Sequence, residues 1–142
     1  MKKYTRRIYT SFVSPLNLDA FIKDNILPII IIRNIRNSKV IGQFSNTSFH
    51  FKELAPSTEL FRSLRDGQIE RDEFNKRYVI EMASVNLFET LRKINYLGDL
   101  CSASGVVLLG YGSDRDKCHR SLLGDLLENT GLLEHPIKEI IQ

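Results

Sequence analysis

The chain has 142 residues, of which 42% are hydrophobic and 26% are charged, and its formal net charge is +3. This length and composition predict one globular domain over residues 1–142 and exclude a disordered chain. The charge is too small to indicate a polyanion-binding protein by itself.

Cysteine content and hydropathy exclude further classes of protein. The two cysteines, Cys101 and Cys118, are too few for a disulfide framework. The long apolar run, Ile26 to Ile32, is too short to cross a bilayer, and the first residues lack the apolar segment of a secretory signal. We therefore expect a cytoplasmic protein without a membrane span.

The first third of the chain predicts a strand–helix–strand unit. Residues 7–13 are typical of a short strand that ends at Ser14-Pro15, and Asn17 can cap a short helix. Residues 27–32 are rich in β-branched side chains without polar alternation, as in an interior parallel strand. Pro28 fits only near the beginning of that strand, where a missing N–H costs little.

Residues 34–56 have no convincing periodicity, apart from a short strand candidate at Val40 and Ile41. A connection of this length inside a small domain is usually functional or mobile. We predict that it is a long irregular loop over the site. Its polar and aromatic residues include Arg36, Gln43, Phe44, His50 and Lys52.

Three helices are predicted next. The first helix is capped by Ser57 and ends at Asp66-Gly67. The second covers residues 70–82, and the third begins at Asn86 with Glu89 in its first turn. The residues expected to face inward are Leu60, Phe61, Leu64, Phe74, Tyr78, Met82, Leu87, Leu91 and Ile94.

The stretch from Gly105 to Leu127 reads as strand, turn and helix. Val106 to Leu109 is a buried strand, Gly110 to Lys117 is a polar turn, and the helix begins near Asp116. This arrangement presents a helix N-terminus to a ligand in open α/β sheets. A final short helix is predicted for residues 136–141.

Several of these segments together resemble a known family. They are Leu54-Ala55-Pro56-Ser57-Thr58-Glu59-Leu60, Leu108-Leu109-Gly110-Tyr111, Cys118-His119-Arg120-Ser121 with the leucine-rich helix, and Tyr9-Thr10-Ser11-Phe12 with Arg33. With this spacing, the chain resembles the bacterial and phage family called domain of unknown function 488 (DUF488) from about Ile8 to Leu127. The resemblance implies an α/β fold with a Rossmann-like parallel sheet and implies no particular activity.

The chain departs from that family at the end of the last long strand. The family usually reads Leu-Cys-Tyr-Glu where this chain has Leu109-Gly110-Tyr111-Gly112, so a thiol and a carboxylate are missing. A mechanism that needs this carboxylate as general base or metal ligand is not expected here. The two glycines instead let backbone N–H groups approach a ligand.

We expect a three-layer α/β domain with a short parallel sheet in the order 2-1-3, counting residues 7–13, 27–32 and 106–109 as the three strands. The ligand crevice then opens where the first and third strands end. Those ends carry Ser11, Tyr111 and Ser113, while Arg33 ends the second strand. We predict these four as ligand-binding residues.

The start of the last long helix completes the predicted site. Its dipole favours an anion, and Arg120 is a bidentate donor suited to phosphate or carboxylate. Tyr111 could stack on a flat group, and His119 or Ser11 could move protons. The predicted ligand is therefore an anionic nucleotide- or nucleoside-like molecule, with catalysis by His119 and Cys118 left open.

Each candidate also has a purely structural interpretation. Arg120 can pair with Asp116 or Asp125 on its own helix, and His119 can cap or pack. Cys118 can be a small buried residue, because its spacing to arginine does not form the Cys-x5-Arg loop of phosphate-ester cleavage. Adjacent Cys118 and His119 diverge around a helix, so we expect no metal site, and no cofactor is predicted.

Two other classes of function remain open at this point. The basic cluster of Lys2, Lys3, Arg6 and Arg7, together with the loop over residues 36–52, could contact nucleic acid. Alternatively, the chain could be a protein-interaction or ligand-sequestering module that has the fold without the chemistry. The oligomeric state is not predicted.

Overall fold

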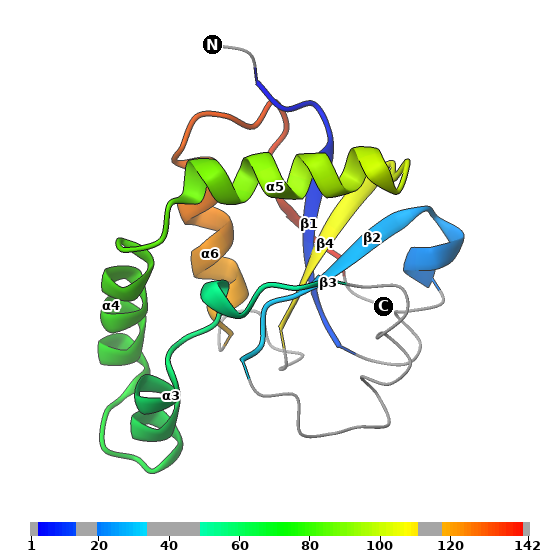
Figure 1. Cartoon of the computed structure of the whole chain (residues 1–142). Helices are drawn as coiled ribbons and strands as arrows, with labels where there is room; N and C mark the ends of the chain where they lie inside the picture. The colour runs from blue at the N-terminus through cyan, green and yellow to red at the C-terminus, as the bar shows by residue number, and fades with distance from the viewer. Residues whose placement is uncertain (1–2, 14–19, 34–48, 111–117, 141–142) are drawn as a thin grey trace.

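A computed structural model describes residues 3–13, 20–33, 49–110 and 118–140 of the chain. Among these residues, five parallel strands form one sheet in the order β3-β2-β4-β1-β5. The strands are β1 (Arg7–Phe12), β2 (Ile26–Ile30), β3 (Phe49–His50), β4 (Gly105–Gly110) and β5 (Lys138–Glu139). The expected α/β class with a parallel sheet is confirmed, and Figure 1 shows the strands side by side.

The predicted order 2-1-3 is wrong, because β4 lies between β2 and β1. Gly105 of β4 is level with both Arg7 and Ile26, and the pairing then runs along both neighbours. All six residues of β4 are buried. A strand that is apolar on both faces is most stable in the middle of the sheet, whereas β1 carries the polar Thr10 and Ser11 and lies one position further out.

Helices connect the strands. A single turn, η1 (Lys52–Leu54), precedes α3 (Thr58–Arg65), α4 (Arg71–Met82) and α5 (Leu87–Leu100), and α6 (His119–Glu128) follows β4. Residues 20–23 are also helical. No helix among the described residues is both long and apolar enough to cross a membrane.

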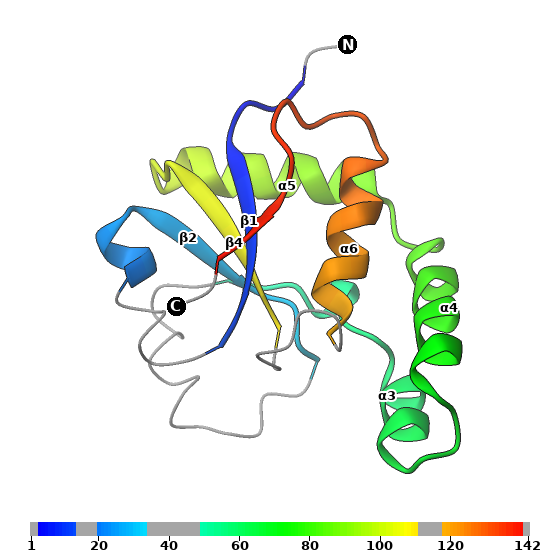
Figure 2. The same ribbon diagram turned by 180° about the vertical axis from the view of Figure 1, so that it is seen from behind.

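Apolar side chains pack on both faces of the sheet. Val106 and Leu108 of β4 join the larger cluster with residues of α3 to α6, whereas Val107 and Leu109 join a smaller cluster with Phe21. Accordingly, α5 crosses in front of the strands in Figure 1 and behind them in Figure 2. These are the three layers that the sequence predicted.

The predicted caps Ser57 and Asn86 are confirmed, whereas Asn17 lies outside the described residues. The Ser57 hydroxyl accepts from Leu60 N at 3.1 Å, and the Asn86 side chain accepts from Glu89 N at 3.1 Å. Phe74, Tyr78 and Met82 are buried as expected. Phe61 was expected to pack inward and does not, since it is 49% exposed.

The helix predicted for residues 136–141 is wrong, because Lys138–Glu139 is the edge strand β5. Tyr9 and Thr10 are its partners in the sheet, and Ile140 N donates to Thr10 O at 2.8 Å. The reason is a long-range one: β5 brings a carboxylate to a buried arginine, as described below. Val40 and Ile41, together with most of the loop predicted over residues 34–56, lie outside the described residues.

Candidate functional site

The candidate site lies at the carboxyl ends of β1 and β4, which are neighbours in the sheet. The chain leaves β1 towards β2 on the Phe21 face, and it leaves β4 through α6 on the opposite face. Neighbouring parallel strands whose connections leave on opposite faces form the usual ligand crevice of an open α/β sheet. The first and third predicted strands are neighbours as expected, although the overall order differs, and a ligand crevice at their ends stays a prediction.

Cys118 and His119 form a pair at the start of α6. Cys118 Sγ lies 3.9 Å from His119 Nδ1, and both side chains are buried. We expected these side chains to diverge around a helix, and that expectation is wrong. Cys118 is the extended N-cap residue, with φ −128° and ψ 143°, so only His119 follows helical geometry and the two side chains converge.

A backbone carbonyl orients the His119 imidazole. His119 Nε2 lies 2.7 Å from Ile31 O, just beyond β2. A carbonyl oxygen can only accept, so Nε2 carries a proton, and Nδ1 is the ring nitrogen that faces the sulfur and can exchange a proton with it. The imidazole thus lies between the thiol and the carbonyl that orients it, which is the arrangement that activates a cysteine nucleophile.

The surroundings of Cys118 favour its thiolate. Burial alone would raise the pKa of the thiol, but His119 and the backbone N–H and guanidinium of Arg120 outweigh it and lower the pKa from 9.0 to about 7. These contacts therefore let the thiolate form at lower pH than in a free cysteine. The thiolate is the reactive form of cysteine.

Gly110 makes room for this sulfur. A Cβ atom added to Gly110 would lie 2.4 Å from Cys118 Sγ, well inside van der Waals contact. The same atom would be 3.6 Å from Arg120 Nη1. Cys118 therefore occupies the space that a side chain at the end of β4 would need.

Arg120 is paired inside the protein. Its side chain is fully buried, and Nη2 lies 2.8 Å from Glu139 Oε2 of β5. Arg120 Nε also donates to the same carboxylate, and Thr10 Oγ1 donates to Glu139 Oε1 at 2.5 Å. Glu139, and not Asp125 of the same helix, is the acidic partner seen among the described residues, while Asp116 lies outside them. This arginine is buried and supports the site.

The other predicted ligand-binding residues have different positions. Ser11 is buried, and its hydroxyl donates to Ile140 O at 2.7 Å. Arg33 is half-buried beyond β2, where its Nε donates to Pro56 O at 3.1 Å. Tyr111 and Ser113 lie outside the described residues, so their ligand-binding roles stay predictions.

Tyr78 was predicted to be a core aromatic residue and also contacts the site. It is fully buried, its hydroxyl donates to Leu54 O at 2.7 Å, and its ring centroid is 5.4 Å from that of His119. Burial, with the negative charges of Cys118 and Glu81 nearby, raises the Tyr78 pKa far above its ordinary value. Tyr78 is therefore an uncharged side chain that packs against the His119 ring.

Two more residues lie near the site: Glu81, which the sequence reasoning missed, and His50, which it named in the loop predicted to lie over the site. Glu81 accepts from both the backbone N and the hydroxyl of Ser57, and His50 Nε2 contacts Ile32 O, next to the carbonyl that binds His119. The sequence carried one usable signal, since Ser57 belongs to the first block that resembles the DUF488 family. Among the described residues, no group of three or more histidine, cysteine or acidic side chains could hold a metal ion.

A family model described as "Active DUF488-N3 subclade" matches residues 29–131 of the chain, well over half of it. The chain belongs to the DUF488 family. The match includes Cys118, His119 and Arg120, whereas β1 and Glu139 lie outside it. This DUF488 domain has no significant match among curated proteins or solved structures.

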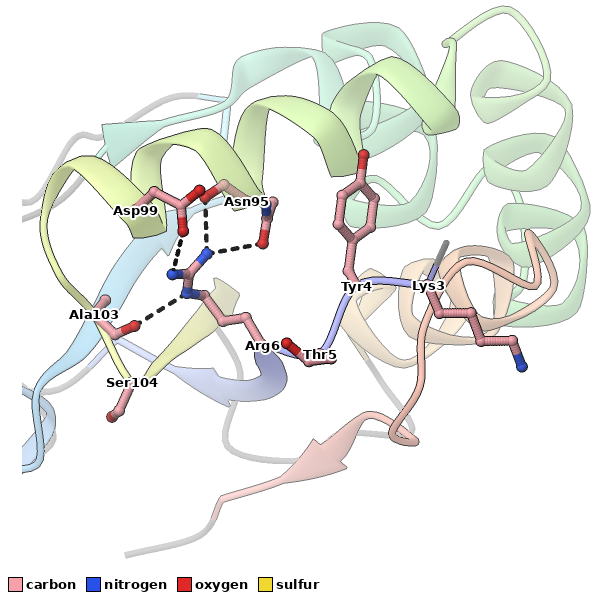
Figure 3. Close-up of a pocket in the computed structure, with 8 residues that line it drawn as sticks. All are labelled: Lys3, Tyr4, Thr5, Arg6, Asn95, Asp99, Ala103 and Ser104. Carbon is pink, nitrogen blue, oxygen red and sulfur yellow. Dashed lines mark hydrogen bonds and ion pairs between the residues drawn. The ribbon is translucent and has the colours of Figure 1, made fainter. Parts of the chain in front are cut away.

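A separate polar pocket of about 530 Å³ lies at the opposite, amino edge of the sheet (Figure 3). Arg6 crosses it and donates to Ala103 O at 3.0 Å, Asn95 O at 2.8 Å and Asp99 Oδ1 at 2.6 Å. One member of the basic N-terminal cluster is therefore turned inward. The use of that cluster for nucleic acid stays a prediction.

We expect Arg6→Ala to lower the free energy of unfolding by about 1–3 kcal/mol, because it leaves acceptors on α5 and before β4 without their donor. Arg7→Ala is the matched control, since Arg7 is exposed and should change stability by less than about 0.5 kcal/mol. Urea unfolding of both variants measures the difference. Equal stabilities would show that the inward arginine is dispensable.

Proposed function

We propose that this DUF488 domain binds a small anionic, nucleotide- or nucleoside-like ligand at the carboxyl ends of β1 and β4, and that Cys118 reacts with it as a nucleophile. The observation that carries the proposal is the convergence of the Cys118 thiol, the His119 imidazole and the Ile31 carbonyl at the start of α6. The crevice between strands whose connections diverge is the expected place for a ligand in this architecture.

The anion would be held by groups that remain near the crevice. The backbone N–H groups of the first turn of α6 carry partial positive charge, and Arg33 lies beyond β2. Arg120 has a supporting role, because Glu139 already binds its guanidinium while its charge still favours the Cys118 thiolate. Tyr111 would contact the flat part of the ligand, as predicted from the sequence.

The proposed reaction is a nucleophilic substitution in two steps. The Cys118 thiolate forms a bond to an electrophilic carbon of the ligand, and the bond from that carbon to its leaving group breaks. The leaving group takes the bonding electrons and a proton from His119 Nδ1. Water, giving its proton back to His119, then displaces the sulfur and releases the product.

The activated thiol can be tested by alkylation with iodoacetamide across pH. In a Cys101→Ser background, which removes the exposed second cysteine, we expect the rate to rise with a midpoint near the Cys118 pKa of about 7. His119→Gln should move the midpoint up by roughly one unit or more, because the thiolate loses its neighbouring imidazole. A midpoint near pH 9 with Cys118 and His119 both intact, or a midpoint that His119→Gln leaves unchanged, would show that His119 does not activate the Cys118 thiol.

The lowered pKa of Cys118 also predicts that the free energy of unfolding depends on pH. The folded pKa of Cys118 is below its unfolded value, so the thiolate contributes fully above about pH 9 and the contribution is lost as pH falls through about 7. We expect the stability difference between the natural protein and Cys118→Ala to grow by roughly 2–3 kcal/mol from pH 6 to pH 9.5. Urea unfolding of both proteins at each pH measures it, and a constant difference would contradict the shift.

The ligand class is tested separately by protection. Nucleotides and nucleosides are screened for slowing alkylation of Cys118, and binding is then measured by calorimetry for the natural protein and for Arg33→Ala. We expect weaker binding of anionic ligands to Arg33→Ala and little change for neutral nucleosides. If no member of the panel protects Cys118 or gives heat, the proposed ligand class is wrong even where the thiol proves reactive.

A further inference from the structure

The outer face of α5 carries large apolar side chains that no other described element covers. Phe88, Tyr96 and Leu100 are 54%, 62% and 64% exposed. In Figure 1, α5 crosses the front of the molecule, and no labelled element lies in front of it. The opposite side of the same helix packs on the sheet through Leu91, Ile94 and Gly98, so the fold holds this outer face in place.

The exposed side chains follow a regular spacing. Phe88, Arg92, Tyr96 and Leu100 are each four residues apart, so they form one continuous stripe along the helix. A helix rises about 1.5 Å per residue, so the stripe is roughly 18 Å long. A stripe of large apolar side chains on a fixed helix is typical of a protein-interaction surface.

We propose that this stripe binds the same stripe of a second copy, with the two α5 helices antiparallel. A two-fold axis through the middle of the stripe places Phe88 opposite the second copy's Leu100, and Arg92 opposite its Tyr96. Every position then meets a complementary one: an apolar side chain faces an apolar side chain, and a guanidinium faces an aromatic ring. The sequence of the stripe is therefore complementary to itself.

The charges next to the stripe do not oppose this pairing. Glu89 and Asp99 would approach each other across the axis, but each already has a cationic partner within its own chain. Glu89 pairs with Arg92, and Asp99 pairs with Arg6 at 2.6 Å. The surface offered to the second copy is thus close to neutral.

The size of the surface predicts a weak dimer. A pair of helices of this length buries less than the roughly 1,200–2,000 Å² of a stable protein–protein interface. We expect a dissociation constant on the order of 10–100 µM. Sedimentation equilibrium over about 1–500 µM protein should show the mean mass rising from the monomer value of 16.4 kDa towards twice that value.

Variants of the stripe test the antiparallel arrangement. Tyr96→Arg sets two arginines against each other at both crossings and should weaken dimerisation at least tenfold. The swap Arg92→Tyr with Tyr96→Arg restores both arginine–tyrosine pairs, and it should recover most of that loss. Ile80→Arg is the matched control, since Ile80 is 70% exposed on α4, outside the stripe, and its dimerisation should be unchanged.

Three results would overturn the proposal: a monomer throughout the concentration range, a dimer that Tyr96→Arg leaves intact, and a swap variant that stays as weak as Tyr96→Arg. All substituted side chains are exposed, and thermal unfolding confirms that each variant is folded. The test does not depend on Cys118, so its outcome is separate from that of the proposed function.

Discussion

Glu139→Ala is expected to lower the free energy of unfolding by about 3–5 kcal/mol, the largest effect of any substitution considered for this chain. Arg120 is fully buried and its charge is balanced by the Glu139 carboxylate, which also accepts from Thr10. Without Glu139, the buried guanidinium loses the carboxylate that accepts two of its N–H groups and balances its charge. Urea unfolding at neutral pH measures the loss.

Two comparisons separate the ion pair from a general effect of removing an acid. Glu134→Ala removes an exposed carboxylate five residues earlier and should change stability by less than about 0.5 kcal/mol. Replacing both partners, Arg120→Met with Glu139→Leu, should recover most of the stability, because neither charge is then buried. A loss below about 1 kcal/mol for Glu139→Ala would mean that the arginine finds another partner.

Gly110→Ala is expected to be the second most damaging change, with a loss of about 1–3 kcal/mol from overpacking. The added methyl group would lie 2.4 Å from Cys118 Sγ, and β4 is the central strand, paired on both sides. The strand cannot move without disturbing β1 and β2. The sulfur has to move instead, and its contact with His119 is lost.

The double variant Gly110→Ala with Cys118→Ala checks this cause. Removing the sulfur frees the space that the new methyl group needs, so the double variant should be more stable than Gly110→Ala alone. Gly67→Ala does not serve as a control, because Gly67 has a positive φ of 74° and is strained for another reason. Additive losses at positions 110 and 118 would show that the two side chains do not compete for space.

The fold could be predicted largely from local patterns. Ser57 and Asn86 cap their helices, and Val106 to Leu109 are buried, because capping and burial depend on short stretches of sequence. The strand order depends on which strand is paired with a neighbour at both of its edges. No single stretch of sequence shows which strand that is. β5 was mistaken for a helix because its two residues pair with Tyr9 and Thr10, and Glu139 also binds Arg120; these partners are distant in sequence.

The candidate site was predicted in part. Cys118 and His119 were selected, but their convergence required the N-cap conformation of Cys118 and the Ile31 carbonyl, which lies just beyond β2 and 88 residues from His119 in the chain. Arg120 was taken as a ligand donor because a free guanidinium and a paired one look the same in a sequence. Its pairing with Glu139 is visible only in three dimensions.

The position of β1 and β5 bears on how much of the chain must be kept together. The family match, residues 29–131, holds the cysteine and histidine but neither of these strands. Cut to that segment, β4 would expose one whole edge and Arg120 would lose its counter-ion. The smallest piece of this protein that folds by itself therefore has to reach from β1 through Glu139, beyond the matched segment at both ends.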